Sequence, residues 1–403
     1  MTSLDPSVAS LDPSLASAAP SLGTALDAAR ALAPAFADRA EKHDRDGSFP
    51  ADDFADLRHT GLLGLMAPTR LGGMGASFAD YAEVAMELAA GSGATALLFN
   101  MHASVTGALA LTDEDLARAL GVPETFFTAR DEVLSGAVAG KHYAVAMSER
   151  QAGSRLSAIT TEYAPVEAGW RIRGTKSFCS GAGHADAYLV AARRGDAISQ
   201  FLVPAGEGVR VIPSWDSLGM RATVSHDIEL DAVVPESALL GQVEGLALVL
   251  AQVMPQWLVA SYAPVYVGVA QAALDAAVAH VEERGLGRLP LVRSRLGRAD
   301  AQITAAREVV RSMARAVTEA PGEPETNRWV WRAKLLAGDT ASEVATSLLE
   351  ACGTSATRRG APLERIFRDA RCGALQPATS DVCSDWLGYA VLGLDPDAEA
   401  QRW

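Results

Sequence analysis

The residues best suited to chemistry gather in two short segments near the middle of the chain. Residues 147–154 read Met-Ser-Glu-Arg-Gln-Ala-Gly-Ser, and residues 174–181 read Gly-Thr-Lys-Ser-Phe-Cys-Ser-Gly. Hydroxyls and backbone amides beside small residues can donate hydrogen bonds to a phosphate or to a developing negative charge, and an aromatic side chain can shield a planar ring from water. The alternatives are an ordinary hairpin turn at Gly153 and Ser154, and a core aromatic at Phe178.

The common cofactor and nucleophile signatures are missing from the sequence. No Gly-x-Gly-x-x-Gly follows a strand, and no Walker loop, HExxH, EF-hand or nucleophile-elbow pattern occurs. The cysteines Cys179, Cys352, Cys372 and Cys383 are far apart and form no CxxC. We therefore expect no metal, no disulfide framework and a reducing cytoplasmic location.

Composition describes an ordinary globular chain. The 403 residues carry 35 Lys and Arg against 49 Asp and Glu, which gives a net charge of −14, and 49% of them are hydrophobic. Such a length allows two to four domains. Without a basic run there is nothing to neutralise a phosphate backbone, so a nucleic-acid partner is not expected.

The N-terminus reads as a tail. Leu4–Ser10 and Leu11–Ser17 repeat the pattern Leu-Asp-Pro-Ser-x-Ala-Ser, and this Pro- and Ser-rich stretch cannot build a core. It has neither a basic start nor an apolar run, so it fits no secretory or mitochondrial signal. Residues 1–22 are therefore predicted to be a disordered tail.

Three blocks follow the tail, and their periodicity predicts an α+β fold. Helical spacing is typical of residues 23–140, where Phe54, Leu57 and Leu62 are examples. Period-two alternation and turn residues predict a β domain over residues 141–243. Ala- and Leu-rich helical stretches return over residues 244–403. This segregated order argues against an alternating βαβ nucleotide-binding fold.

One apolar segment bears on membranes and on assembly. Gly245–Leu274 contains no charged residue and is long enough to raise the question of a membrane span. Glutamines and prolines interrupt it and no basic flank marks an inside face, so a buried helix is favoured and no membrane is expected. An apolar surface of this size predicts burial in a subunit interface, and hence a homotetramer or homodimer.

Several phrases, in this order, resemble the acyl-CoA dehydrogenase superfamily from about Ala28 to Gly393. They are Asp46–Pro50, Gly61–Leu65, Pro68–Gly75, Met147–Ser154, Gly174–Gly181, Leu218–Thr223 and Arg368–Arg371. The resemblance implies an N-terminal helical domain, a middle antiparallel β-barrel or sandwich and a C-terminal four-helix bundle. It also implies FAD and an acyl-CoA or related thioester as substrate.

The resemblance assigns cofactor contacts residue by residue. Those within one chain would be Met147, Ser148, Gly153, Ser154, Phe178, Ser180 and Thr379. Gly353 would meet the FAD of a neighbouring subunit, and Arg284 is the candidate for its pyrophosphate. A solvated arginine at a helix end is the alternative for Arg284.

The catalytic base of the family does not carry over. Its glutamate position, counted from the Arg368–Arg371 motif, is Pro377 here, and proline cannot accept a proton. The alternative glutamate position corresponds to Leu258 and Val259, which also carry no carboxylate. Asp381 is a weak candidate, with an exposed or helix-capping role as its alternative, so the catalytic residue is unassigned.

The C-terminal region is more similar to the branch that includes flavin monooxygenases such as dibenzothiophene monooxygenase. His102 sits where that branch commonly has a histidine over the flavin, although a hydrogen-bonded core histidine is the alternative. The late histidine of the branch falls at Gln376.

Three functions remain open. The first is FAD-dependent CH–CH oxidation of an acyl thioester with an atypical base, with an electron-transfer flavoprotein as partner. The second is a two-component flavin monooxygenase served by a flavin reductase. The third is a catalytically silent flavin-binding homologue.

Overall fold

The computed structural model describes residues 22–394, without the side chains of Leu22, Gln252 and Val253. The predicted tail thus lies outside the described residues except for Leu22, where the first helix begins. The helices are α1 (Leu22–Asp46), α2 (Ala51–His59), α3 (Phe78–Gly91), α4 (Gly93–Ala110), α5 (Glu114–Ala119), α6 (Glu124–Val138), α7 (Leu246–Val253), α8 (Tyr262–Glu283), α9 (Pro290–Glu319), α10 (Pro324–Cys352), α11 (Pro362–Arg371) and α12 (Ser380–Leu392). The strands are β1 (Tyr143–Ala146), β2 (Glu162–Val166), β3 (Gly169–Cys179), β4 (Ala187–Arg194), β5 (Ala197–Pro204), β6 (Val209–Ile212) and β7 (His226–Val234).

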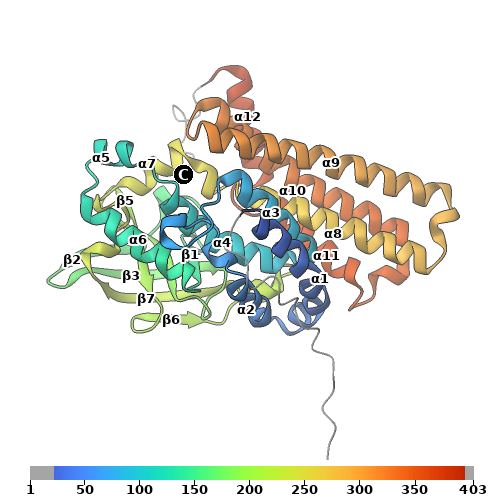
Figure 1. Ribbon diagram of the computed structural model, residues 1–403, viewed down its shortest axis with the longest axis horizontal. Helices are drawn as coiled ribbons and strands as arrows, with labels where there is room; N and C mark the ends of the chain where they lie inside the picture. Colours follow the sequence, from blue (N-terminus) through green and yellow to red (C-terminus); the bar gives the residue numbers. More distant parts are fainter. Residues whose placement is uncertain (1–21, 395–403) are drawn as a thin grey trace, which may run out of the picture.

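The predicted order of helices, strands and helices is confirmed (Figure 1). The sheet lies at one end of the molecule, and the long helices α8, α9 and α10 extend away from it at the other. Between them lie α1, α3 and α4. The boundaries proposed at residues 140 and 243 stay predictions, but both fall outside the helices and strands.

Local capping explains where the two central helices begin. The Ser77 hydroxyl accepts a hydrogen bond from the Asp80 N–H, and the Asp80 carboxylate accepts one from the Ser77 N–H in return. This reciprocal pair satisfies donors that a helix start leaves open. Ser92 caps α4 in a similar way through the Thr95 N–H. Helix α4 is then buried along nearly its whole length, so it forms the floor between the sheet and the bundle.

The β domain is one curled sheet in the order β1-β4-β2-β3-β7-β6, with β5 also paired to β4. The predicted alternation is confirmed in β3, where Ile172 is buried between exposed Arg171 and Arg173. The sheet is not purely antiparallel, because β4 pairs in parallel with both β1 and β2. Since two strands separate β1 from β4 in sequence, the connection is long enough to let them run the same way.

The uncharged segment Gly245–Leu274 is not one helix. Helix α7 ends at Val253, a short turn follows at Pro255–Trp257, and α8 begins at Tyr262. Pro255–Glu283 is long and apolar enough to cross a membrane by length and composition, but 78% of its most apolar window is buried inside the fold.

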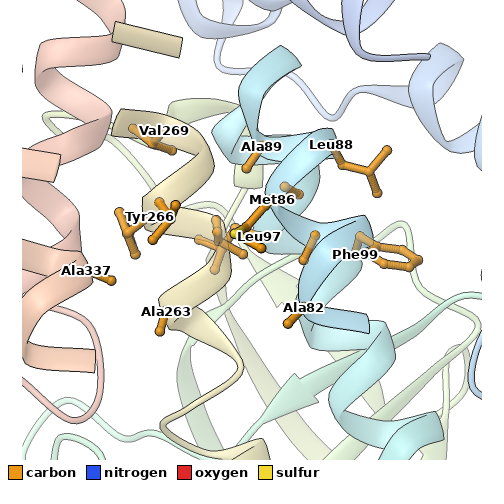
Figure 2. Packing of buried hydrophobic residues seen from close by; sticks show 14 of the residues in the cluster. Ala82, Met86, Leu88, Ala89, Leu97, Phe99, Ala263, Tyr266, Val269 and Ala337 are labelled. Carbon is orange, nitrogen blue, oxygen red and sulfur yellow. The ribbon is translucent and has the colours of Figure 1, made fainter. Parts of the chain in front are cut away.

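Helix α8 finds its partners within the chain. It packs against α3 and α10, as Figure 2 shows around Tyr266, Met86 and Ala337. A Cβ at Gly268 would lie 2.3 Å from the Met86 carbonyl oxygen, so only glycine permits this approach. The apolar surface that led us to expect a subunit interface is therefore largely buried within one subunit. An oligomer stays a prediction without that support.

The last of the family-like phrases holds the fold together. Both Nη atoms of Arg368 donate to the Asp44 carboxylate, at 2.9 and 2.6 Å. The Asp369 carboxylate accepts a hydrogen bond from the Met220 N–H at 2.5 Å. Burial raises the pKa of Asp369 to about 6, although Arg365 and that hydrogen bond act in the opposite direction. This phrase therefore joins the first helix, the loop before β7 and the bundle.

Candidate active site

A cavity of about 1020 Å³ lies where the N-terminal helices, the sheet and the bundle meet. Seven of the predicted cofactor residues line it, although they come from distant parts of the sequence. They are Met147, Ser148, Gly153, Ser154, Phe178, Ser180 and Thr379. The resemblance alone assigned these seven residues to a cofactor, and all of them line one cavity. This cavity is therefore the candidate site.

Met147 and Ser148 directly follow β1 and form one wall of the cavity, and backbone hydrogen bonds hold this segment in place. The Ser148 carbonyl accepts a hydrogen bond from the Ser177 N–H at 2.9 Å, which joins the segment after β1 to the end of β3. The Met147 sulfur accepts a weak hydrogen bond from the Gln200 amide at 3.7 Å. The side chains of Met147 and Ser148 are thus presented to the cavity from an anchored segment.

A buried ion pair braces this wall, and sequence reasoning missed it. Lys176 Nζ lies 2.8 Å from Glu149 Oε1 and 3.2 Å from the Met147 carbonyl oxygen. Glu149 also accepts hydrogen bonds from the backbone and hydroxyl of both Thr160 and Thr161. Burial alone would raise the pKa of Glu149, but the charge and hydrogen bond of Lys176 lower it to about 2. Arg150 directly follows Glu149, and Arg171 and Arg173 shortly precede Lys176, so the sequence alone did not single out this pair.

Phe178 occupies a strained backbone position at the cavity. Its φ is +58°, at a bulge in the pairing of β3 with β7. Its side chain is 59% exposed and meets Trp215 edge to face, with ring centroids 6.2 Å apart. A left-handed backbone at an aromatic residue is uncommon and costs free energy, which points to a functional constraint. The exposure of the ring excludes the core-aromatic alternative.

The turn at Gly153 is tight and open toward the cavity. Gly153 and Glu149 exchange two backbone hydrogen bonds of 2.7 and 3.0 Å, and Gly153 has a φ of +61°. A Cβ added there would meet no atom within 4 Å. A ligand can therefore approach the backbone beside the exposed Ser154 closely.

A chain of hydroxyls ends at Ser180. Thr223 Oγ1 donates to the Met220 carbonyl at 2.8 Å, so its hydrogen is committed. The 2.7 Å contact between Thr223 and Ser225 therefore uses the hydrogen of Ser225, and the 3.0 Å contact between Ser225 and Ser180 uses that of Ser180. Ser180 consequently offers an acceptor to the cavity.

These features fit a flavin. The aromatic wall and the apolar floor suit the ring, the hydroxyl at Ser180 suits an N–H group on its polar edge, and the open Gly153 turn suits a phosphate. No carboxylate is directed into the part of the wall that these residues form.

Asp113 is the one carboxylate in the described lining of the cavity, and it caps a helix. Pro377 lines the cavity at the position expected for the base. The charged lining residues are Asp113 and Arg371. Asp113 caps α5 by accepting from the N–H groups of Asp115 and Leu116, and Arg371 donates to the Ser342 hydroxyl. General-base catalysis by a carboxylate thus has no group in place.

His102 is not brought into the cavity. Its Nε2 donates to the Leu63 carbonyl at 2.7 Å, and its Nδ1 accepts from the Tyr143 N–H at 3.1 Å. The side chain is 1% exposed, and burial lowers its pKa to about 4. The core-histidine alternative therefore describes its placement, and the position over a flavin does not.

The other predicted residues also lie outside the cavity. Asp381 is exposed in the first turn of α12, where Thr379 is the capping residue. Arg284 and Gly353 are exposed at the C-terminal ends of α8 and α10. A 3.1 Å hydrogen bond between His280 and Ser355 ties those ends together. Arg284 and Gly353 thus share one end of the bundle, and their contact with a neighbouring subunit stays a prediction.

Comparison with known proteins shows the family of the chain. The family models for the N-terminal, middle and C-terminal domains of acyl-CoA dehydrogenase match residues 24–116, 144–233 and 260–380. L-Evernosamine nitrososynthase from a Micromonospora species is 30% identical over 93% of this chain and 91% of its own. 3-Sulfinopropanoyl-CoA desulfinase from Variovorax paradoxus is 30% identical over 91% of this chain and 93% of its own.

Two solved structures are similar over nearly the whole chain. KijD3 in complex with FMN and a dTDP-linked amino keto sugar superposes with a TM-score of 0.81, 27% identity and coverage of 94% of this chain and 96% of its own. TdsC from a Paenibacillus species, in complex with FMN and indole, superposes with a TM-score of 0.78 and 27% identity. The match covers 92% of this chain and 97% of TdsC. With the motifs and the cavity, these matches confirm a flavin cofactor, consistent with the predicted FAD. The chain belongs to the acyl-CoA dehydrogenase superfamily and is a flavin-dependent oxidoreductase.

Proposed function

We propose that this protein is the oxygenase component of a two-component flavin monooxygenase. One atom of dioxygen enters a small organic substrate and the other leaves as water, with two electrons supplied by a separate nicotinamide-dependent flavin reductase. The observation that carries the proposal is the cavity itself, where Pro377 replaces the base and both charged lining residues are already bonded.

The residues of the chain have defined parts in this proposal. A bound flavin supplies the two-electron redox chemistry. Phe178 shields the ring face from water, Ser180 accepts from its edge, and the Gly153 turn receives the phosphate. The brace of Glu149 and Lys176 keeps this wall in place. None of these parts requires removal of a substrate proton by a carboxylate.

Acyl thioester chemistry is the second candidate. It is favoured by the similarity to 3-sulfinopropanoyl-CoA desulfinase over most of the chain. Dehydrogenation of a thioester by the usual route needs a base beside the substrate, however, and the described lining offers none. An electron-transfer flavoprotein would be the partner in this case, in place of a reductase.

Two measurements on the FAD-loaded protein separate the candidates. In an anaerobic titration with butyryl-CoA, we expect the visible absorption of the oxidised flavin to persist. With a flavin reductase, NADH, indole as probe and isotopically labelled dioxygen, we expect labelled product by mass spectrometry. Rapid bleaching by butyryl-CoA would contradict the proposal. The Pro377→Glu variant, which restores a carboxylate at the base position, should also resist bleaching.

A further inference from the structure

Gln376 lies at the cavity, two residues after Ala374 and beside Pro377, in the segment between α11 and α12. The hydroxyl of Tyr266 donates to Gln376 Oε1 at 2.7 Å. Tyr266 belongs to α8 and is fully buried, so its hydroxyl has a fixed position. Because the Tyr266 hydroxyl donates its hydrogen to the amide oxygen of Gln376, the oxygen of this amide is bonded and its nitrogen is left free.

The amide nitrogen of Gln376 donates to no group in the described part of the chain. The half-buried side chain lines the cavity, so this nitrogen is a donor available to a ligand there. Its two hydrogens can only be given to an acceptor. Gln376 therefore presents a neutral donor where the related enzymes were expected to present a histidine.

The backbone that carries Gln376 is also held in place. Lys334 Nζ donates to the Gly373 carbonyl at 2.8 Å and to the Gln376 carbonyl at 3.1 Å. Lys334 comes from α10 and is fully buried, and burial lowers its pKa to about 8. With Tyr266 on the side chain and Lys334 on the backbone, the donor is preorganised before any ligand arrives.

Apart from polar residues such as Asp113, Gln256 and Tyr262, the rest of the described lining is mainly apolar. Helices α5 and α7 and the residues between α4 and α5 contribute mainly leucines, of which Leu111, Leu116 and Leu120 are 42–49% exposed. Leucines that line a cavity with that much surface uncovered fit an apolar ligand. A nucleoside diphosphate or coenzyme A would add phosphate charges to those of the cofactor, and Arg371 is the one cationic side chain in the described lining.

On the basis of the proposed function, we propose that the substrate is an uncharged, largely apolar molecule with one hydrogen-bond acceptor, and that the amide N–H group of Gln376 recognises this acceptor. Gln376 is then the specificity-determining residue. Tyr266 and Lys334 are positioning residues that act through it. Among the ligands of related proteins, indole shares the uncharged, apolar character of this class but offers an N–H donor in place of an acceptor, whereas a dTDP-linked sugar is charged.

Calorimetric titration of the FAD-loaded protein with two bicyclic probes tests this inference. 1-Indanone carries a carbonyl acceptor, and indane has a similar shape without one. One neutral hydrogen bond predicts that 1-indanone binds about 3- to 10-fold more tightly. Gln376→Leu should remove this preference while the affinity for indane stays within about twofold. Tyr266→Phe should reduce the preference. Its matched control is Tyr143→Phe, which removes a phenol that donates to the Val133 carbonyl at 2.8 Å outside the cavity lining and should leave the preference unchanged.

The outcomes separate this inference from the proposed function. A preference for 1-indanone that survives in Gln376→Leu would overturn it, as would failure of both probes to bind. Tighter binding of dTDP or butyryl-CoA than of either probe would overturn the uncharged class. Since the titration needs no turnover, an expected result here without oxygen-dependent product would contradict only the monooxygenase proposal.

Discussion

Lys176 Nζ lies 2.8 Å from Glu149 Oε1, and the two side chains are buried behind the wall that carries Met147, Ser148 and Phe178. The pair links the segment after β1 to β3 along the wall of the cavity. Removing one partner leaves the other charge buried without compensation, which is the costly case for ion pairs. The site wall therefore depends on two groups that do not line the cavity themselves.

Either Glu149→Gln or Lys176→Met should lower the free energy of unfolding by about 3–5 kcal/mol, because each leaves a buried charge unpaired. The double variant should cost clearly less than the sum of the two. Urea denaturation of the four proteins measures this coupling. The exposed pair of Arg171 on β3 and Asp231 on β7 is the matched control and should couple by less than about 1 kcal/mol. Equal coupling in both pairs would contradict the brace.

His102 should make the protein sensitive to acid. The unfolded histidine takes up a proton near pH 6.5, whereas burial holds the pKa of the folded one at about 4. Its contribution is therefore fully present above about pH 6.5 and is lost as the pH falls toward 4, by about 3 kcal/mol in total. The His102→Gln variant lacks this pH-dependent contribution to stability. The stability difference between wild type and variant should thus shrink on acidification, as followed by denaturation at several pH values.

The exposed His59 supplies the comparison for that experiment. The same subtraction for His59→Gln controls for the loss of an imidazole at the surface, and the difference for His102→Gln should change more on acidification. Because buried carboxyls such as Asp369 are common to all three proteins, their own pH dependence cancels in each difference. A constant difference between wild type and His102→Gln from pH 7.5 to 4.5 would contradict the prediction.

The sequence predicts more of the fold than of the candidate site. Period-two alternation around Ile172 and helical spacing around Leu57 both reflect burial on one face, and burial decides these elements. The Asp369 bond to Met220 joins residues 149 apart in sequence, and no local pattern reports such a distance. His102 illustrates the same limit, because a histidine at a flavin and a histidine bonded to Leu63 have the same helical context.

The donor role of Gln376 could not be predicted from its own position either. Its amide is oriented by Tyr266, which is 110 residues earlier in the chain. Likewise, the part of the apolar run that lies in α8 is buried by α3 and α10 within one subunit, whereas the run alone suggested an interface. Residue types at a site follow from the sequence, but their partners follow from packing between distant elements.

Ser154→Asp should weaken flavin binding by at least about tenfold. A carboxylate beside the phosphate of the cofactor adds like-charge repulsion, and about 1.4 kcal/mol of repulsion already gives that factor. Ser154→Asn has a similar shape and no charge, so it should bind flavin nearly as well as wild type. Quenching of flavin fluorescence on titration with protein measures both affinities. Equal affinities for the Asp and Asn variants would show that the phosphate lies elsewhere.

The backbone of Phe178 should lower the stability of the protein, and its ring should strengthen cofactor binding. Its φ of +58° is unfavourable for any residue with a Cβ, and its ring is 59% exposed, so the ring itself stabilises the protein little. Phe178→Gly relieves the backbone, and Phe178→Ala removes the same ring but keeps the strain. Without flavin, the Gly variant should be more stable than the Ala variant by about 1 kcal/mol. Both should bind flavin more weakly than wild type to a similar degree, because the aromatic wall is lost in each. If the Gly variant were no more stable than the Ala variant, the strain would not exist in solution. If both retained the wild-type affinity for flavin, Phe178 would not be the wall of the flavin site.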